Sequence, residues 1–420
     1  MEVLSILNII VGILFTVCTG YQMVFAILRL FGKIRKHGEA KRQCRYGVLI
    51  AARNEEKVIG HLIDSIKRQD YPSELVDVYV IADNCDDDTA AVSEAHGARV
   101  FVRFNKEQVG KGYALKALLQ HIREDYPDEK YDGFFIFDAD NLLDKDYIKE
   151  MNKVFSNGNR IVTGYRNTKN YGDNWITAGY GLYFLRESEQ LNRERDYVGV
   201  SAFVSGTGYL FSSDLLGPDG DWKWLCLTED LQFTADMISR GERVAYCYDA
   251  ILYDEQPRGF MASLVQRRRW IKGYFQTLKL HGGALWKRLF SHHSFSCYDI
   301  LMNVAPLVLT TLNIIFNFAL LITGLTTERE HMWIFIVSFV MSLGGAYLVL
   351  YLLGLMSAIT ERKRIRCPMG KVIMYTFSFP IFVFTFCFSV VMAAMGKVTW
   401  QPVRHSVSVG IDDIDKTTSK

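Results

Sequence analysis

Four long apolar runs limit this 420-residue chain to folds that a lipid bilayer can accommodate. Each run is longer than the roughly 20 residues that a helix needs to cross the hydrocarbon core. Because only helices and closed barrels satisfy all their backbone polar groups in lipid, we predict helices here. The runs cover residues 4–31, 300–325, 332–359 and 372–395. We therefore expect an integral membrane protein whose middle section lies outside the lipid.

Basic residues beside these runs predict the side of the membrane that each segment occupies. Six lysines and arginines follow the first run within residues 33–45, and the connector at 361–366 is also basic. By the positive-inside rule, the middle section faces the cytoplasm, in the plasma membrane, and the amino terminus faces outward. Pro380 could kink the last run into an interfacial or re-entrant element, so the side of the tail stays open.

Charge and cysteine spacing exclude several other classes of protein. The net charge is only +2, and the basic residues form short clusters beside apolar runs. This pattern favours lipid headgroups over nucleic acid as a partner. The eight cysteines show no Cys-x-x-Cys spacing, so we expect neither a disulfide framework nor a zinc site. Unpaired thiols suit a reducing cytosol.

The middle section, from residue 46 to about 253, alternates short β-branched or aromatic runs with helical stretches. This is the pattern of a Rossmann-like α/β domain with a mostly parallel sheet. Strands are predicted at 46–52, 76–82, 100–103 and 133–138, and helices at 55–68, 89–97, 111–124 and 145–155. Polar clusters follow three of the strands, at 53–55, 83–88 and 138–141. Because the carboxyl ends of parallel strands share one edge of the sheet, we expect one ligand-binding crevice.

Two acidic motifs fit such a crevice. Asp138 and Asp140 follow an apolar strand and flank one residue, so a turn can aim both carboxylates at Mg²⁺ or Mn²⁺, which also binds a diphosphate. A solvated turn or a helix cap is the structural alternative. Thr228, Glu229 and Asp230 precede a helical run, where Thr228 would cap the helix. Alternatively, Asp230 is a general base that removes the proton of an acceptor hydroxyl.

Three further motifs have both a structural and a functional interpretation. The sequence Gln-Arg-Arg-Arg-Trp at 266–270 lies on an amphipathic stretch that would bind anionic lipid. Alternatively, Arg269 neutralises a departing diphosphate and Trp270 stacks on an acceptor sugar. The Ser-Gly-Thr-Gly at 205–208 is a tight turn or a place where the backbone approaches a ligand. Lys111 is an ordinary exposed lysine or a phosphate contact.

In this order, the motifs resemble the membrane-integrated family 2 glycosyltransferases, which include cellulose, hyaluronan, chitin and poly-N-acetylglucosamine synthases. The resemblance runs from about residue 47 to 273 and includes the flanking membrane helices. It implies a cytosolic α/β domain of the GT-A (Rossmann-like) fold joined to an α-helical transmembrane region. The implied segments are an N-terminal transmembrane helix (1–32), the catalytic domain (33–258), amphipathic interface helices (259–298), three transmembrane helices (299–396) and a tail (397–420).

The resemblance also implies a role for each matching residue. Asp230 would be the catalytic base, and Asp140 with Asp138 would hold the Mg²⁺ or Mn²⁺. The nucleotide sugar would contact Ala51, Arg53, Glu55, Asp83, Lys111, Asp138 and Arg269. The acceptor would contact Ser205, Gly206, Thr207, Glu229, Gln266 and Trp270. Direct displacement on an α-linked UDP-sugar would invert the linkage to β.

Three functions remain open at this point. The first is a processive synthase that elongates an extracellular β-linked polysaccharide and secretes it through its own helices. The Gly-Thr at 206–207, with Ser before it where cellulose synthases carry Cys, favours UDP-glucose. The second is a glycolipid synthase, similar to ceramide glucosyltransferases, that adds one sugar to a membrane lipid. The third is a transporter or lipid-binding protein whose α/β domain only senses nucleotide. Intramembrane charge is scarce, which argues against an ion or proton pathway.

Overall fold

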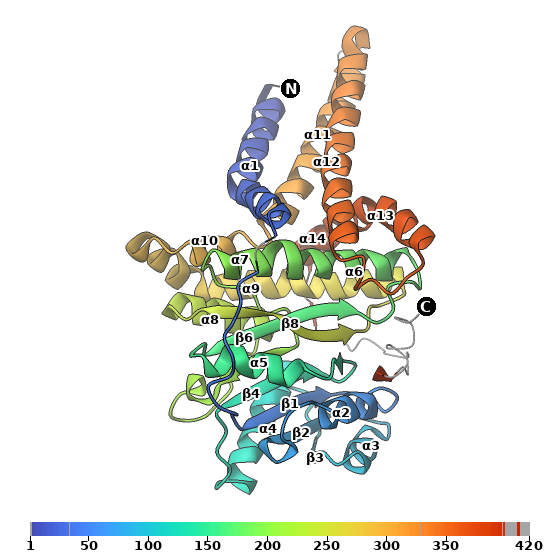
Figure 1. Cartoon of the computed structure of the whole chain (residues 1–420). Helices are drawn as coiled ribbons and strands as arrows, with labels where there is room; N and C mark the ends of the chain where they lie inside the picture. Colours follow the sequence, from blue (N-terminus) through green and yellow to red (C-terminus); the bar gives the residue numbers. More distant parts are fainter. Residues whose placement is uncertain (1, 33, 328, 397, 400–409, 412–420) are drawn as a thin grey trace.

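The computed structural model describes every residue except 1, 33, 328, 397, 400–409 and 412–420. An α/β domain occupies one end of the molecule, and long helices project from the other (Figure 1). The domain is built on one eight-stranded sheet with the order β3-β2-β1-β4-β7-β6-β8-β5. The strands are β1 (Tyr46–Ala52), β2 (Val76–Asp83), β3 (Arg99–Arg103), β4 (Gly133–Asp138), β5 (Leu142–Leu143), β6 (Ile161–Thr168), β7 (Tyr209–Ser212) and β8 (Val244–Asp254). The predicted α/β class is confirmed.

The four predicted strands form the parallel half of the sheet, with β1 between β2 and β4. In the other half, β6 and β8 run in the same direction as β1 to β4, as a mostly parallel sheet requires, whereas β7 and β5 run against them. There, β7 runs antiparallel to both β4 and β6, whereas β6 and β8 are parallel. The sheet is therefore mixed, because the short strand β7 enters between β4 and β6 in the opposite direction.

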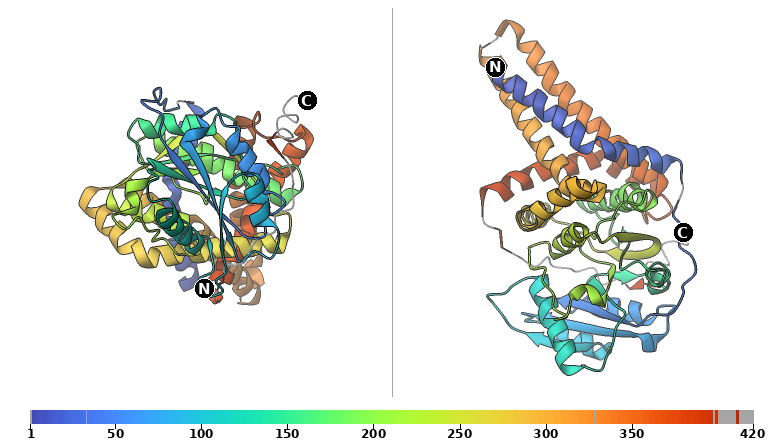
Figure 2. Two further views of the ribbon diagram at one scale, coloured as in Figure 1. Left: turned by 90° about the horizontal axis from the view of Figure 1, so that it is seen from below. Right: turned by 90° about the vertical axis from the view of Figure 1, so that its left-hand side faces the viewer.

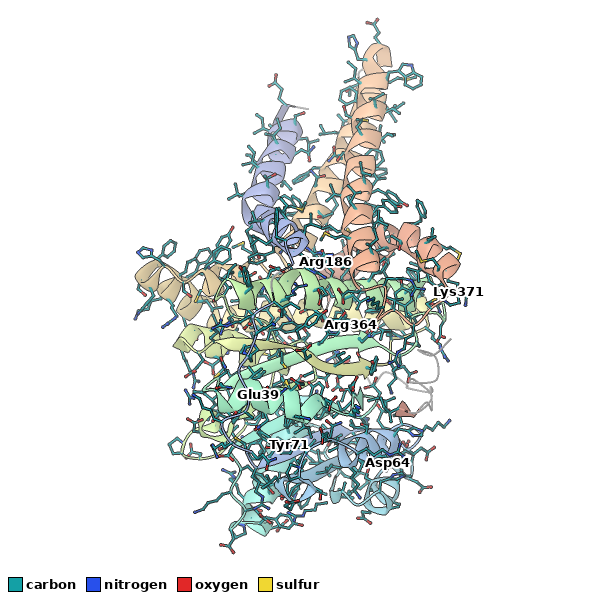
Figure 3. The ribbon with its side chains drawn as sticks, viewed as in Figure 1. Glu39, Asp64, Tyr71, Arg186, Arg364 and Lys371 are labelled. Atoms are coloured by element: carbon teal, nitrogen blue, oxygen red, sulfur yellow. The ribbon has the colours of Figure 1, made fainter. Side chains whose placement is uncertain are left out.

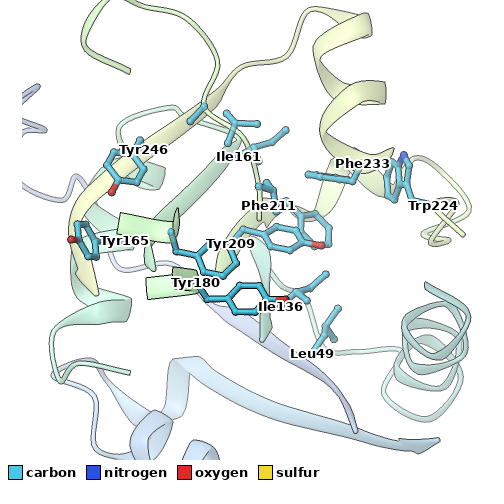
Figure 4. Close-up of a cluster of buried hydrophobic side chains, with 14 of the residues drawn as sticks. Leu49, Ile136, Ile161, Tyr165, Tyr180, Tyr209, Phe211, Trp224, Phe233 and Tyr246 are labelled. Carbon is cyan, nitrogen blue, oxygen red and sulfur yellow. The ribbon is translucent and has the colours of Figure 1, made fainter. Parts of the chain in front are cut away.

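Helices cover both faces of the sheet. On one face lie α2 (Ile59–Lys67), α3 (Thr89–Ala95) and α5 (Tyr147–Ser156), and on the other lie α4 (Lys111–Asp125), α6 (Trp175–Arg186) and α8 (Glu229–Arg240). Alternate residues of a strand point to opposite faces, so Val48 and Leu49 enter different cores. Figure 4 shows part of the core on the face that α4, α6 and α8 cover, where Tyr209 and Phe211 of β7 pack with Phe233 of α8.

The helix predicted at residues 55–68 begins later, at Ile59. Asn54 takes a left-handed backbone conformation, with a φ of 59°. The Glu55 backbone N–H donates to Thr89 Oγ1 over 2.8 Å. Residues 53–58 are therefore a loop at the carboxyl end of β1 rather than the first turn of a helix.

Three long apolar helices leave the domain together: α1 (Glu2–Leu30), α11 (Ala305–Thr327) and α12 (Met332–Thr360). In their most apolar 18-residue windows, 11%, 6% and 0% of the residues are buried inside the protein. The fourth run, Met369–Met395, is equally apolar, but 44% of its window is buried. It forms two helices, α13 (Met369–Phe384) and α14 (Phe386–Met395), which lie across the end of the domain (Figure 2).

Buried ion pairs join the projecting helices to the domain. Arg29 at the end of α1 contacts Glu189 at 2.7 Å and Glu361, which follows α12, at 3.2 Å. Glu189 belongs to a π-helix, Glu187–Asn192, between α6 and α7 (Arg193–Tyr197). Nearby, Arg364 lies 4.0 Å above the ring of Tyr165 on β6, and the labels of Arg186 and Arg364 mark this level in Figure 3. Charged contacts of this kind fix where the helices meet the domain.

Candidate active site

One cavity of about 270 Å³ lies at the carboxyl ends of β1, β2 and β4. It extends between the sheet and α9 (Phe260–His292). The predicted site residues that line it are Ala51, Arg53, Glu55, Asp83, Lys111, Asp138, Asp140, Ser205, Gly206, Glu229, Asp230, Gln266, Arg269 and Trp270. Thr207 does not line it. The structure therefore brings together residues that are up to 219 positions apart in the chain.

Two side chains, those of Thr207 and Lys111, hold the acidic turn at the end of β4 in place. The Asp138 backbone N–H donates to Thr207 Oγ1 over 2.9 Å, so Thr207 supports the turn from beneath the cavity. Lys111 Nζ donates to Asp138 Oδ1 over 2.5 Å and to the Gly206 carbonyl over 2.7 Å. Lys111 is thus a largely buried, ion-paired residue with 13% of its side chain exposed, which excludes the alternative of an ordinary exposed lysine.

Asp140 is the more buried of the two carboxylates, with 2% of its surface exposed. Its Oδ2 accepts the backbone N–H of Glu255 over 3.1 Å. Among the residues that the structure describes, no group of three or more His, Cys, Asp or Glu side chains could hold a metal alone. Two carboxylates beside a phosphate-sized space still fit Mg²⁺ or Mn²⁺, because these ions commonly take their other ligands from substrate phosphates and water.

The Thr-Glu-Asp motif lies at the start of α8, but Thr228 does not cap the helix. Its side chain makes no capping hydrogen bond, and its Oγ1 is buried without a partner. Burial raises the pKa of Glu229 to about 7, while Lys111, 3.8 Å away, opposes that rise. Burial also raises the pKa of Asp230, opposed by the backbone N–H of Leu231 and by Lys111. Asp230 is thus a carboxylate whose proton affinity suits a general base.

The loop at 205–208 separates the two groups of carboxylates. Gly206 has a φ of +81°, and a Cβ added there would lie 3.9 Å from Asp230 Oδ2 and 4.0 Å from Asp138 Oδ2. Its neighbour Ser205 donates to Glu187, and the Ser205 carbonyl accepts from Arg166 Nη1 over 2.6 Å. The loop is therefore both a tight turn before β7 and a wall of the cavity.

The Gln-Arg-Arg-Arg-Trp motif lies on α9, and its residues divide between two faces. Gln266, Arg269 and Trp270 line the cavity because positions three and four apart share one face of a helix. Arg269 Nη1 donates to the Leu227 carbonyl over 2.9 Å, and the Trp270 ring meets Tyr180 edge to face. The second residue of the motif, Arg267, does not line the cavity and is fully buried.

Four charged residues of the cavity were not predicted from the sequence: Arg166, Glu187, Asp254 and Glu255. Arg166 pairs with Asp254, and its guanidinium lies 3.7 Å from the ring centroid of Phe184. Burial raises the pKa of Asp254 to about 6, although Arg166 lowers it. Asp254 is the last residue of β8 and Glu255 follows it. Polar residues at the carboxyl end of a strand are the same signal that predicted the first three polar clusters. Glu187 is aimed inward by the π-helix, for which the sequence offers no comparable signal.

The two ends of the cavity differ in character. At the sheet end, Asp83 is bound by Arg103, whose Nη1 donates to Asp83 Oδ1 over 2.5 Å. At the other end, close to the start of α11, the lining is mainly apolar and comprises Ile271, Tyr274, Val304, Leu307 and Phe386. The cavity therefore leads from a charged crevice toward the level of the membrane helices.

Comparisons with known proteins add a family and a fold. The family profile described as "Glycosyltransferase like family 2" matches residues 44–273. The beta-monoglucosyldiacylglycerol synthase of Synechocystis sp. is 25% identical over 235 residues, which are 54% of this chain and 47% of that protein. Glucomannan 4-beta-mannosyltransferase 7 of Arabidopsis thaliana is 26% identical over 271 residues, covering 59% of this chain and 47% of that protein. The chain thus spans about half the length of these curated relatives.

A solved structure shares the fold over most of the chain. The mannosyltransferase PcManGT of Pyrobaculum calidifontis, solved with GDP-Man and Mn²⁺, superimposes with a TM-score of 0.59 and 15% identity. The match covers 92% of this chain and 99% of that one. The domain is accordingly a GT-A-like α/β domain with a mixed sheet, followed by long apolar helices consistent with a membrane region.

Proposed function

Because this chain belongs to the glycosyltransferase-like family 2, we propose that it transfers a sugar from a UDP-sugar to a hydroxyl acceptor at the cytoplasmic face of the plasma membrane. The observation that carries the proposal is the position of Asp230 across the 205–208 loop from Asp138 and Asp140, in one cavity. Direct displacement at a sugar carbon needs the base and the leaving group on opposite sides of that carbon. The arrangement therefore supports an inverting transfer.

The residues at the sheet end suit the donor. Asp83 would face the uracil base, while Lys111 and Arg269 would lie beside the diphosphate and offset its charge. A bound Mg²⁺ or Mn²⁺ would supply further positive charge to the leaving group. Asp140 and Asp138 would hold that ion together with the phosphate oxygens. Asp230 would take the proton of the acceptor hydroxyl while that oxygen attacks.

The membrane end of the cavity favours a lipid as the acceptor. Its apolar lining, including Val304, Leu307 and Phe386, suits the hydrocarbon part of a molecule whose hydroxyl reaches Asp230. The second candidate is elongation of an extracellular β-linked polysaccharide from UDP-glucose. That alternative is favoured by the aromatic rings of Trp270, Phe184 and Tyr183, on which a glycan could stack.

Release of UDP by the purified protein tests the transfer itself. We expect release with one UDP-sugar in the presence of Mg²⁺ or Mn²⁺ and a lipid extract. Asp230→Asn should lower the turnover number by about 10²-fold to 10⁴-fold, the usual contribution of a general base. Asp249→Asn, at an exposed carboxylate on β8, is the matched control and should keep wild-type turnover. Undiminished transfer by Asp230→Asn would refute the proposal.

Product analysis then separates the two acceptors. Thin-layer chromatography of the labelled product should show a single glycolipid that resists glucanase. A high-mass product that glucanase digests would instead establish the polysaccharide alternative.

A further inference from the structure

We propose that the last apolar run, Met369–Met395, does not cross the bilayer but forms the membrane-side wall of the active-site cavity, with Arg267 as the positioning residue that holds it there. The run is long and apolar enough to cross, with a mean hydropathy of 2.1. It is nevertheless divided at Thr385 into α13 and α14. In Figures 1 and 2 these two helices lie across the end of the domain, from which α1, α11 and α12 project.

Arg267 reaches from α9 to the point where the run is divided. Its Nη1 donates to Thr385 Oγ1 over 2.7 Å and to the Phe382 carbonyl over 3.2 Å. Its Nε donates to the Ser263 carbonyl of its own helix. The Phe382 carbonyl also accepts from the Thr385 backbone N–H over 3.2 Å and from Thr385 Oγ1 over 2.6 Å. The guanidinium therefore binds the two groups that close the turn between α13 and α14.

The guanidinium of Arg267 is buried among aromatic rings rather than beside a carboxylate. Arg267 is 0% exposed, and no carboxylate of the described residues lies within 4.0 Å of it. Its charge instead faces aromatic rings, 4.5 Å from the centroid of Phe386 and 4.7 Å from that of Phe382. A buried cation without a counter-ion is costly unless hydrogen bonds and ring faces compensate it. Moving the run away would remove these hydrogen bonds and ring contacts from the guanidinium.

The same contacts shape the cavity. Phe386 follows Thr385 directly, lines the cavity and stacks on Tyr183 with centroids 5.6 Å apart. Trp270, three residues after Arg267 on α9, lines the cavity as well. A Cβ added to Gly179 of α6 would lie 2.3 Å from Phe382, so α6 and the run are in direct contact. Arg267 thus fixes the relative positions of two aromatic side chains that face the acceptor.

A residue after the run gives an independent indication of its course. Ile411 packs against Leu142 of β5 and Tyr253 of β8, on the catalytic domain. If α1, α11 and α12 cross the bilayer and the last run does not, residue 411 lies on the same side as the domain. Only a residue on the same side of the bilayer as the domain can pack against Leu142 and Tyr253, as Ile411 does.

Protease accessibility in sealed vesicles tests the topology. The full chain would carry a cleavable epitope tag after residue 420 and be placed in inside-out and right-side-out vesicles. We expect cleavage in inside-out vesicles, in which the domain also becomes accessible. Cleavage only in right-side-out vesicles would overturn the proposal. This measurement does not depend on enzymatic activity, so it remains decisive even if the proposed sugar transfer is wrong.

Kinetics test the role of Arg267 and rest on the proposed transfer. In Arg267→Met and, more mildly, Thr385→Val, we expect the KM for the acceptor to rise, by about tenfold to a hundredfold in Arg267→Met, with the KM for UDP-sugar unchanged. Arg267→Lys should recover part of the loss. Lys279→Met, at an exposed lysine of the same helix, is the control. A loss of active protein with both KM values unchanged in Thr385→Val would show a merely structural role and overturn this assignment.

Discussion

Substituting Gly273 with alanine should separate α8 from α9 at the active site. A Cβ added at Gly273 would lie 2.2 Å from Thr228 Oγ1, 2.7 Å from its Cγ2 and 2.9 Å from its Cβ. All three contacts are far shorter than a van der Waals contact, and Thr228 is short, branched and only two residues before Asp230. The side chain has no long flexible end that could move aside. The helices must therefore shift apart, which moves Asp230 relative to Trp270.

The size of the effect follows from overpacking. Inserting a methyl group into a tightly packed site usually costs about 1–3 kcal/mol of stability. A displacement of about 1 Å in an active site can lower the rate by about 10²-fold. We therefore expect Gly273→Ala to lose both thermal stability and most of the sugar-transfer rate.

Two further variants make the test specific. Gly283→Ala lies on the same helix, where an added Cβ meets nothing within 4 Å, so it should keep activity and gain up to about 1 kcal/mol from better helix propensity. Thr228→Ala removes two of the three clashing atoms and should partly rescue Gly273→Ala in a double-mutant cycle. Thermal unfolding and UDP release would be measured for wild type, the three single variants and the double variant. Equal behaviour of Gly273→Ala and Gly283→Ala would refute the packing argument.

Further predictions concern protonation and metal binding. Because burial raises the pKa of Glu229 to about 7 and also raises that of Asp230, kcat/KM should fall as the pH is lowered through neutrality, and not only below about pH 4 as for exposed carboxylates. Glu229→Gln should move that fall to lower pH in a pH–rate profile, and an unchanged profile would exclude the coupling. Burial and Glu361 also raise the pKa of Glu189 to about 7, so the folded state binds more protons than the unfolded state between about pH 4.5 and 7. Stability should decrease as pH rises through this window, and thermal melts of Glu189→Gln should lose that slope. EDTA should abolish transfer and Mn²⁺ restore it, and Mn²⁺ with UDP should raise the melting temperature of wild type but not of Asp140→Asn.

The sequence alone determined the features that depend on neighbouring residues. Apolar strands such as residues 133–138 end in Asp138, so the strand itself carries its acidic turn to the sheet edge. Gln266, Arg269 and Trp270 share a helical face because 3.6 residues make one turn. The long apolar helices α1, α11 and α12 followed from the length of their apolar runs, and the α/β class followed from the alternation of two periodicities. Each of these properties is encoded by the order of residues that are near neighbours along the chain, repeated over the length of the element or domain.

Only the tertiary structure decided the features that pair distant segments. The four residues of β7 carry too little pattern to identify a strand, and their direction depends on β4 and β6 on either side. Arg166 meets Asp254 across 88 positions of sequence. The last apolar run has the composition of a membrane span, yet it packs onto α6 and α9 because Arg267 and the aromatic side chains around it offer it partners. Composition sets what a segment can do in lipid, whereas contacts made by distant residues determine which of those options has the lower free energy.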